Sequence, residues 1–308
     1  MRCVVDNTLK FKEKLEEYLE DCELIINEPL KNHTTFKVGG TADLFAIPNN
    51  YEDIIRMIDF CKKNKMKYYV LGNGSNVLVR DAGYRGLIIK TSHLNEIKVQ
   101  GKYVIAQCGA ELKDVAKICT KHSLTGFEFA CGIPGSIGGA IAMNAGAYDG
   151  EMKDIVEECV VIDDELKIKT LSREQLELSY RNSAIQKYGY IALEVKIKLD
   201  NGDNKNIKEK VEDLTNRREE KQPLDVQSAG STFKRAPGHY TGKLIQDSGL
   251  KGYSIGGAQI SNKHAGFVIN KGDATANDIL NLIGHIQKVV KENYDVELEP
   301  EVRIIGEE

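Results

Sequence analysis

The sequence lacks the short motifs that mark several functional classes. It has seven cysteines but no CxxC pair, and its six histidines form no HExxH or similar pattern, so no metal site is predicted. The odd number and wide spacing of the cysteines favour reduced thiols in a cytosolic protein over a disulfide framework. No P-loop of the GxxxxGKS or GxxxxGKT type is present, which argues against an enzyme that hydrolyses nucleoside triphosphates.

Extremes of charge and long hydrophobic runs are missing as well. The 42 basic and 46 acidic residues give a net charge of −4, and no basic run indicates a nucleic-acid partner. The N-terminal region is charged throughout and holds no apolar segment, so no signal peptide is predicted. The longest uncharged stretch, from Phe129 to Tyr148, is too rich in glycine for a lipid-facing helix. We therefore expect a soluble, cytoplasmic monomer that binds neither nucleic acid nor membrane.

What is present is the composition of a globular protein, with 41% hydrophobic and 29% charged residues, and 308 residues predict two or three domains. Apolar residues at helical spacing predict helices over residues 8–20, 51–65, 112–122, 207–221, 243–248 and 277–292, and a short one near 173–178. Strands are predicted over residues 68–71, 77–79, 87–90, 103–107, 159–163, 190–199, 265–269 and 302–305. Because strands and helices do not alternate regularly, the order of elements indicates an α+β fold.

A first glycine loop, residues 72–76, follows the predicted strand 68–71. Gly72 and Gly74 let the backbone turn sharply and aim successive N–H groups at one point, which makes an anion-binding nest. A plain hairpin turn is the alternative, because Asn-Gly is a common hairpin dipeptide. The loop is not a Rossmann fingerprint, since the third glycine is missing and a strand-like segment follows.

A second glycine loop, residues 132–140, holds four glycines and one proline within eight positions. Packing explains such a run poorly, because a glycine costs about 1 kcal/mol of ordering relative to alanine. Small side chains let a ligand approach the backbone, and residues 140–147 can begin a helix whose N-terminus faces a pyrophosphate. The two loops together suggest an extended cofactor that carries two phosphates.

Three further residues are candidates for chemistry. Ser231 lies among small residues and is followed by Lys234, but a lone serine is by default a turn or cap residue. Arg181 is by default a solvated surface arginine, and Glu301 by default caps a strand edge. Position alone therefore assigns a role to none of the three.

Seven segments, taken together, resemble one known family. They occur in the order found in the UDP-N-acetylenolpyruvoylglucosamine reductases, and the resemblance runs from about residue 25 to 308. The segments cover residues 32–40, 72–76, 132–147, 180–183, 229–234, 263–267 and 299–306. Only fifty positions separate Arg181 from Ser231, which resembles the shorter variety of the family without a tyrosine lid loop.

The resemblance implies a two-subdomain FAD-binding module of the vanillyl-alcohol-oxidase (PCMH) kind and a small C-terminal α+β substrate domain. The module is expected over residues 1–204, with the N-terminal helix 8–20 and subdomains at about 25–92 and 93–204. The substrate domain is expected over residues 205–298, because the polar stretch 200–206 is the best boundary. Residues 299–308 are expected to return to the active site.

The resemblance also implies a reaction of peptidoglycan synthesis, in which NADPH reduces FAD and flavin N5 passes hydride to UDP-N-acetylglucosamine enolpyruvate. Ser231 matches the family's proton donor, while Arg181 and Glu301 match residues that stabilise the substrate carboxylate as negative charge builds on it. The residues implied to hold FAD are Asn73, Gly74, Ser75, Asn76, Gly135, Ser136, Gly138, Gly139 and Arg303. Those implied to bind the substrate are Lys221, Lys234 and Tyr180.

Two alternatives are kept open. Another flavin oxidase or dehydrogenase of the same fold would keep both glycine loops but would not require Ser231, Arg181 and Glu301 together. A non-catalytic nucleotide-binding regulator would bind a ligand without redox turnover.

Overall fold

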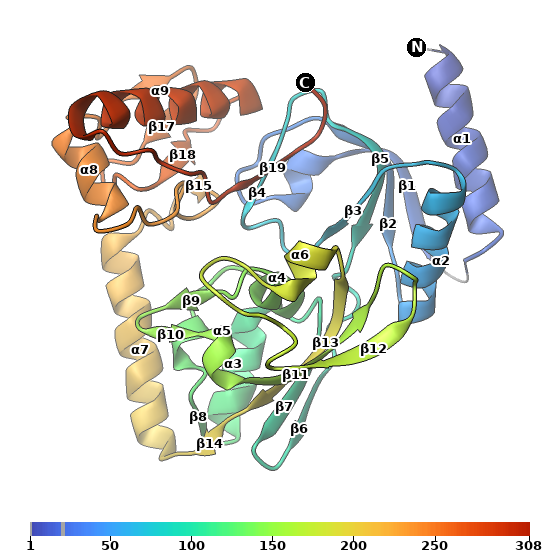
Figure 1. Ribbon diagram of the computed structural model, residues 1–308, viewed down its shortest axis with the longest axis horizontal. Helices are drawn as coiled ribbons and strands as arrows, with labels where there is room; N and C mark the ends of the chain where they lie inside the picture. Colours follow the sequence, from blue (N-terminus) through green and yellow to red (C-terminus); the bar gives the residue numbers. More distant parts are fainter. Residues whose placement is uncertain (1, 20–21) are drawn as a thin grey trace. The chain divides into compact units, whose positions relative to one another are not determined.

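Figure 1 shows a computed structural model of the protein, which describes the backbone of residues 2–19 and 22–308 and the side chains from residue 8 onward. The chain divides into two compact units. Unit 1 consists of the residues up to 26 with 44–73 and 86–218, and unit 2 consists of residues 27–43, 74–85 and 219–308. The FAD-binding and substrate domains expected over residues 1–204 and 205–298 are defined by what each binds, whereas the two units are defined by compactness. The expected domains therefore stay predictions.

Most helices lie where the apolar spacing predicted them. The helices described in unit 1 are α1 (Arg2–Glu16), α2 (Tyr51–Lys63), α3 (Leu112–Lys121), α4 (Ile137–Ala142), α5 (Met152–Ile155), α6 (Ala184–Tyr188) and most of α7 (Asn204–Lys221). Apolar spacing predicted α1, α2, α3 and α7 but not the short helices α5 and α6. The helix predicted over residues 8–20 begins earlier and stops at Glu16, and its predicted end at residue 20 lies outside the described residues. Asn50 caps α2, because its Oδ1 accepts a hydrogen bond from Asp53 N at 2.8 Å.

The short helix predicted near residues 173–178 is wrong, because these residues form a turn after strand β12 (Ile168–Ser172). Ser172 Oγ accepts a hydrogen bond from Gln175 N at 3.4 Å, and Gln175 Oε1 accepts one from Ser172 N at 2.9 Å. This reciprocal pair is a capping box, which begins one helical turn at Ser172, and Leu176 N donates to Ser172 O at 3.0 Å within that turn. Glu177 then takes a φ of 46°, outside the right-handed helical region, and the segment ends after one turn.

The larger sheet of unit 1 is antiparallel, with the strand order β12-β11-β13-β7-β6. Its other strands are β11 (Val156–Ile162), β13 (Ile191–Lys198), β7 (Tyr103–Gln107) and β6 (Ile97–Gln100). Two short pairs accompany it, β8 (Leu124–Thr125) with β14 (Asp200–Asn201) and β9 (Gly146–Ala147) with β10 (Gly150–Glu151). Val104 and Val195 of the sheet are fully buried with Val115 of α3 and Ile141 of α4 in one core.

A second sheet has the strand order β1-β2-β5-β3, in which β3 and β5 run parallel. Its strands are β1 (Glu23–Pro29), β2 (Thr41–Ile47), β3 (Tyr68–Leu71) and β5 (Tyr84–Lys90). In unit 1, Ile54 and Ile58 of α2 pack with Leu44 and Leu87, and all four side chains are fully buried. The apolar face predicted for this helix is therefore its core face.

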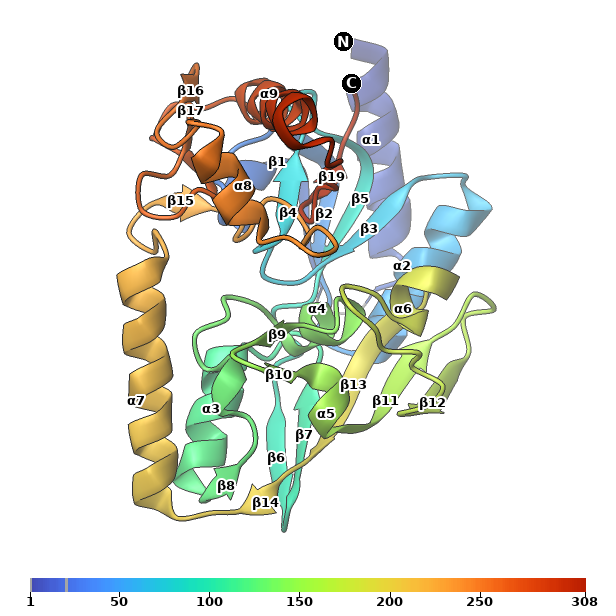
Figure 2. The ribbon, with the colours of Figure 1, turned by 60° about the vertical axis from the view of Figure 1, so that its left-hand side comes forward.

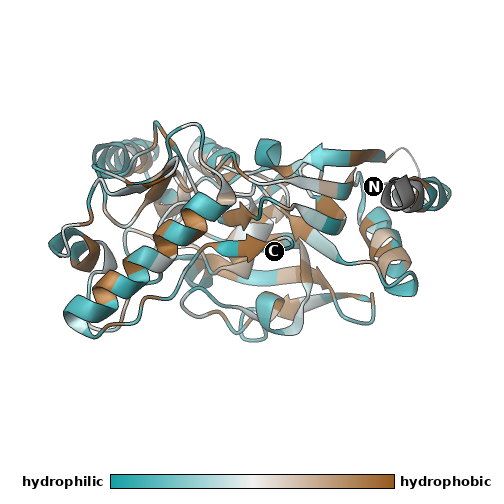
Figure 3. Ribbon diagram, turned by 90° about the horizontal axis from the view of Figure 1, so that it is seen from above, coloured by the Kyte–Doolittle hydropathy of each residue, from teal (hydrophilic) through white to brown (hydrophobic). Residues whose placement is uncertain are grey.

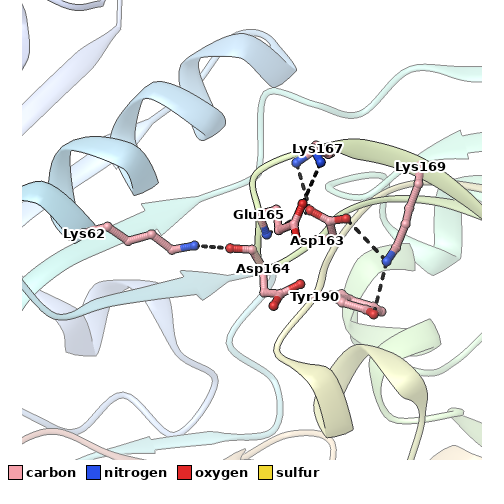
Figure 4. Close-up of polar contacts among 7 residues, drawn as sticks. All are labelled: Lys62, Asp163, Asp164, Glu165, Lys167, Lys169 and Tyr190. Carbon is pink, nitrogen blue, oxygen red and sulfur yellow. Dashed lines mark hydrogen bonds and ion pairs between the residues drawn. The ribbon is translucent and has the colours of Figure 1, made fainter.

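A polar cluster closes the hairpin between β11 and β12 (Figure 4). Asp163 Oδ1 accepts hydrogen bonds from the backbone N–H groups of Glu165 and Lys167 at 3.0 and 2.9 Å. Lys169 Nζ lies 3.4 Å from Asp163 Oδ2 and donates to the Tyr190 hydroxyl at 3.1 Å. The backbone bond from Lys167 is the largest influence on Asp163, and the pKa of this carboxyl is lowered. These groups satisfy one another's hydrogen-bonding capacity, so the cluster stabilises the turn between β11 and β12.

Unit 2 contains an antiparallel sheet of order β15-β18-β17-β16, against which helix α9 packs (Figure 1). Its elements are β15 (Gln227–Ser228), α8 (Thr241–Asp247), β16 (Ser254–Ile255), β17 (Ala258–Ile260), β18 (Val268–Asn270) and α9 (Ala276–Tyr294). The 3-10 turns are η1 (Leu30–His33) in unit 2 and η2 (Glu128–Ala130) in unit 1. Strands β4 (Val77–Val79) and β19 (Arg303–Ile305) of unit 2 pair in parallel.

The core of unit 2 is assembled from three separate stretches of chain. Phe36, Val38 and Leu78 are at most 3% exposed and pack with C-terminal residues such as Leu282. Asn270 Nδ2 adds a hydrogen bond to Phe36 O at 3.0 Å. Residues 219–308 therefore do not contain the whole core of this unit.

Helices and antiparallel sheets together confirm the predicted α+β fold. Figure 3 shows bands of hydrophobic and hydrophilic residues that alternate along the helices, as expected where a helix buries one face. Within residues 2–19 and 22–308, none of the helices has both the length and the apolar character needed to cross a membrane.

Helix α7 lies alongside α3 in unit 1 (Figures 1 and 2), and a buried carboxylate lies at this contact. Glu128, 3% exposed, accepts hydrogen bonds from Thr125 Oγ1 at 2.6 Å and Gly126 N at 2.9 Å. Lys210 Nζ of α7 lies 3.2 Å from Glu128 Oε2. Burial raises the pKa of Glu128, but these bonds more than offset it, so the pKa lies below its usual value.

Glu128→Gln is expected to lower the free energy of unfolding by about 1–3 kcal/mol at pH 7, because bonds to a charged acceptor are weakened. A carboxyl whose pKa falls on folding stabilises the protein above its unfolded-state pKa, and this contribution disappears as pH falls through the folded-state pKa. Urea melts should therefore show the gap to the parent narrowing from pH 7 to below about pH 4. Glu209→Gln, at an exposed position of α7, is the control, and a gap independent of pH would contradict the assignment.

Candidate active site

The two predicted glycine loops adjoin each other in unit 1. Gly72 lies so close to Ser136 that a β-carbon on Gly72 would come 2.4 Å from the Ser136 hydroxyl oxygen. Lys90 of β5 donates from Nζ to Gly72 O at 2.6 Å and supports the first loop. Loops far apart in the sequence therefore meet, as a cofactor that touches both requires.

The second loop is held to the larger sheet by its backbone. Gly138 N donates to Cys108 O at 2.8 Å, and a β-carbon on Gly138 would come 2.9 Å from that of Cys108. By contrast, a β-carbon on the exposed Gly139 would meet only the Ser136 hydroxyl, at 3.6 Å. Packing therefore explains Gly138, whereas Gly139 leaves backbone open to a ligand.

The helix expected from residue 140 begins earlier, as α4 at Ile137. Ser136 is its N-cap, because its Oγ accepts a hydrogen bond from Gly139 N at 3.4 Å. Ser136 thus stabilises the conformation of the second glycine loop, of which it is itself a member.

Several backbone donors of the two loops find no acceptor among the residues that the structure describes. Within residues 22–308, the N–H groups of Asn73, Gly135 and Ser136 in unit 1 donate no hydrogen bond to protein, and neither do those of residues 74–76 in unit 2. Unused N–H groups beside small side chains are what a phosphate-bearing cofactor binds. The residues present therefore fit a dinucleotide cofactor such as FAD.

A turn in unit 1 presents two of the predicted substrate residues. Ser179 and Asn182 exchange backbone hydrogen bonds at 3.1 Å, which places Tyr180 and Arg181 at the tip. Arg181 takes a φ of 55°, a conformation that costs a non-glycine residue about 1 kcal/mol or more. Its guanidinium carbon lies 5.1 Å from the centre of the Tyr180 ring, which is 52% exposed. The pair offers a cation beside an aromatic face.

This turn is bound to the glycine-rich block of residues 132–147. Asn144, fully buried, donates from Nδ2 to Ser179 O at 3.1 Å, and Ser183 Oγ donates to Ala142 O at 2.7 Å. Arg181 is therefore fixed to the same part of unit 1 as the second glycine loop.

Ser231 lies in unit 2 on the loop between β15 and α8, and its side chain is exposed. The next residue is anchored, since Thr232 N donates to Gly266 O at 2.9 Å and Thr232 Oγ1 accepts from Val268 N at 2.9 Å. Thr232 O accepts a hydrogen bond from Glu301 N at 2.8 Å. The backbone thereby places Ser231 and Glu301 in one neighbourhood.

Asn76 and Arg303 adjoin Glu301 in the same unit. Asn76 Nδ2 donates to Glu301 O at 3.2 Å, and Arg303 N donates to Asn76 O at 2.9 Å. These bonds continue the parallel pairing of β4 with β19. The C-terminal segment is therefore fixed against residues 74–76 of the first glycine loop.

The two predicted lysines differ in their surroundings. Lys234 Nζ pairs with the Glu299 carboxylate, and Lys234 N donates to Glu299 O at 2.9 Å. Lys221 is exposed at the end of α7. Within unit 2, backbone bonds thus link the segments that carry Ser231, Lys234 and Glu301.

Sequence reasoning missed Arg218 as a neighbour of the second loop. Its side chain is 9% exposed, and its guanidinium donates to Gly132 O. Burial lowers the pKa of Arg218. A β-carbon on Gly132 would come 2.9 Å from Arg218 Cδ, so the arginine requires this glycine. The sequence of a charged helix does not indicate which of its cations is buried.

The cysteines with described side chains are free thiols, as the spacing predicted. Burial raises the pKa of the Cys61, Cys108 and Cys119 thiols to about 12, so these groups stay neutral and unreactive. Among the described residues, no three His, Cys, Asp or Glu side chains are grouped so that they could hold a metal ion.

Two family patterns match the chain. A FAD binding domain matches residues 42–172, and the C-terminal domain of UDP-N-acetylenolpyruvoylglucosamine reductase matches residues 222–305. The crystal structure of UDP-N-acetylenolpyruvylglucosamine reductase from Thermus caldophilus is similar, with a TM-score of 0.80 and 32% identity over 94% of this chain and 100% of that chain. A glucose dehydrogenase, Phl p 4.0202, shares the fold alone, with a TM-score of 0.52 and 13% identity over 63% of this chain and 44% of that chain.

Known relatives are closer in sequence. The UDP-N-acetylenolpyruvoylglucosamine reductase of Clostridium perfringens strain SM101 is 54% identical over 298 residues, which are 97% of this chain and 98% of that protein. That of Clostridium botulinum strain Hall is 55% identical over 295 residues, which are 96% of each chain. The chain therefore belongs to the UDP-N-acetylenolpyruvoylglucosamine reductase family.

Proposed function

We propose that the protein reduces the enolpyruvyl group of UDP-N-acetylglucosamine enolpyruvate to give UDP-N-acetylmuramate, a step of peptidoglycan synthesis. FAD is the cofactor and NADPH the reductant, and we expect the protein to act as a monomer in the cytoplasm. The observation that carries the proposal is the 54% identity with the Clostridium perfringens reductase over 97% of the chain. The FAD binding domain match and the open backbone donors of the glycine loops support FAD.

Arg181 and Glu301 are proposed to bind the substrate carboxylate. When bound, FAD supplies hydride transfer from NADPH to the double bond conjugated with this carboxylate. Negative charge then builds on the carboxylate, and a guanidinium stabilises it with two parallel N–H bonds. The strained φ of Arg181 supports this role, because such strain persists mainly where function requires it. Glu301 is proposed to stabilise the same group, either as a protonated partner or as a hydrogen-bonded one.

Ser231 is proposed to deliver the proton that completes the reduction. The carbon next to the carboxylate needs a proton donor, and the Ser231 hydroxyl is exposed on a loop whose next residue, Thr232, is anchored by three hydrogen bonds. Lys221, exposed at the end of α7, and Lys234 are proposed to bind the UDP diphosphate and the region of the reacting carboxylate. Tyr180 is proposed to contact the substrate through its exposed ring.

The purified protein is expected to be yellow, to bleach anaerobically with NADPH, and to recover its colour when the enolpyruvyl sugar nucleotide is added. Absorbance of the flavin follows both steps. Colourless protein without flavin uptake would refute the proposal. Bleaching without recovery would favour an oxidase or dehydrogenase of the same fold, and bound nucleotide without any bleaching would favour a regulator.

A further inference from the structure

One side-chain amide in unit 1 binds the backbone of Arg181 directly. Gln186, half-buried on helix α6, donates a hydrogen bond from Nε2 to Arg181 O at 3.3 Å. The same Nε2 also donates to Ala142 O and lies 3.4 Å from Met143 Sδ. Because two carbonyl oxygens and a thioether sulfur are all acceptors, only the NH2 end of the amide can face them. The side chain of Gln186 therefore has one defined orientation.

Through Ala142 O, this amide joins the turn of residues 179–182 to helix α4, which lies beside α6 (Figures 1 and 2). Ala142 is the last residue of α4, and the last carbonyl groups of a helix have no partner within it. Ser183, fully buried, also donates to Ala142 O, from Oγ at 2.7 Å. The other end of α4 carries the second glycine loop, since Ser136 is its N-cap. Six residues of helix, about 9 Å of rise, thus separate that loop from the anchor of the turn.

Arg181 needs such an anchor because its backbone is strained. Its φ of 55° lies in the left-handed region, which an arginine keeps only when the surrounding structure imposes it. Asn144 holds the turn at Ser179 O, two residues earlier in the chain. Gln186 instead binds the carbonyl of Arg181 itself. Without this amide the peptide group after Arg181 would be held less firmly, and a relaxed φ would redirect the guanidinium.

We propose that Gln186 is a positioning residue, which aims the guanidinium of Arg181 at the substrate carboxylate by fixing Arg181 O to the end of α4. The inference rests on the proposed function, because it assigns the carboxylate to Arg181. A cation stabilises developing charge best when it is held in place before the reaction, and a displacement of about 1 Å can slow a reaction about a hundredfold. Gln186 acts through Arg181 rather than by contact with the substrate.

Gln186→Met tests the proposal, because methionine keeps the length and unbranched shape of glutamine and has no hydrogen-bond donor. We expect the enolpyruvyl sugar nucleotide to reoxidise the reduced flavin about ten- to a hundredfold more slowly in this variant. Reduction of the flavin by NADPH should stay within about threefold of the parental rate, since the carboxylate is absent from that step. Anaerobic stopped-flow absorbance of the FAD-loaded protein measures both rates.

Gln107→Met is the matched control in unit 1. Gln107 is a half-buried glutamine at the end of β7, and its side chain also makes two hydrogen bonds. Its Oε1 accepts from Glu96 N at 2.9 Å, and its Nε2 donates to the Tyr51 hydroxyl at 3.2 Å. The control should keep both parental rates, because these bonds do not reach Arg181. If it slowed reoxidation as much as Gln186→Met does, the proposal would be wrong.

A double-mutant cycle with Arg181→Ala separates positioning from a general structural role. If Gln186 acts through Arg181, Gln186→Met should change the reoxidation rate of the Arg181→Ala variant by less than about twofold. A general loss of structure would instead slow reoxidation by the same factor with and without the arginine.

A parental reoxidation rate in Gln186→Met overturns the proposal. So does equal slowing in the two backgrounds, equal slowing of the two half-reactions, or failure of the variant to fold, because the amide would then have only a structural role. If Arg181→Ala itself reoxidises at the parental rate, the proposed role of Arg181 fails as well, and the two failures are told apart.

Discussion

Ser231→Ala is expected to leave reduction of the bound flavin by NADPH nearly intact and to slow its reoxidation by the enolpyruvyl substrate about a thousandfold or more. The substitution should separate the two half-reactions, because the proton of Ser231 is proposed to go to the substrate carbon, and the substrate reacts only in the second half-reaction. The side chain is exposed, and Thr232 keeps its backbone bonds to Gly266 and Glu301, so the substitution should remove the hydroxyl without moving the loop. Anaerobic stopped-flow absorbance measures each half-reaction by itself.

Ser228→Ala is the control for this experiment. Ser228 ends the short strand β15 of the same unit and is half-buried. Both half-reactions should keep their parental rates in this variant. If Ser231→Ala slowed the two half-reactions equally, Ser231 would have a binding or structural role and the proposed proton transfer would be wrong.

Phe36→Ala is expected to lower the free energy of unfolding by about 3–5 kcal/mol, the usual cost of a cavity left by a buried phenyl ring. Phe36 is 1% exposed in the core of unit 2, among side chains from the far end of the chain. Urea denaturation followed by circular dichroism measures the loss. Phe36→Leu, which leaves a smaller cavity, should lose clearly less, and a loss below about 1 kcal/mol for the alanine variant would mean that the core is not built on this ring.

A second readout is which elements of unit 2 the Phe36→Ala substitution destabilises. Because the ring packs with α9 and β18 residues such as Leu282 and Val268, amide hydrogen exchange should accelerate in these C-terminal elements. Acceleration confined to the residues next to Phe36 in the sequence would contradict the discontinuous core.

Elements with a strong local pattern could be predicted from the sequence. The strands predicted over residues 68–71, 77–79 and 103–107 have these bounds in the structure, and α2 begins at the predicted Tyr51. Each depends on residues within a few positions of one another. The error at residues 173–178 also has a local origin, because the bonds between Ser172 and Gln175 begin a helical turn that the positive φ of Glu177 ends at once.

Glycines mark a limit of sequence reasoning. Gly138 and Gly139 are neighbours and both were assigned to the cofactor, yet a β-carbon would collide with Cys108 at the first and make only an ordinary contact, with the Ser136 hydroxyl, at the second. A third, Gly132, makes room for Arg218. The sequence does not distinguish a glycine required by packing from one required by a ligand. Only the atoms around each glycine in the folded protein do so.

The sequence by itself determined the class of fold, most helices and strands, and the ordered segments that resemble the reductase family. It did so because periodicity, capping and turn chemistry act between near neighbours, and because the segments keep their order. Only the tertiary structure decided that Phe36 belongs to the C-terminal core, that Asn144 fixes the turn of Arg181, and that Arg218 is buried. Such contacts join residues far apart in the chain, and no local pattern specifies which distant partner a side chain will meet.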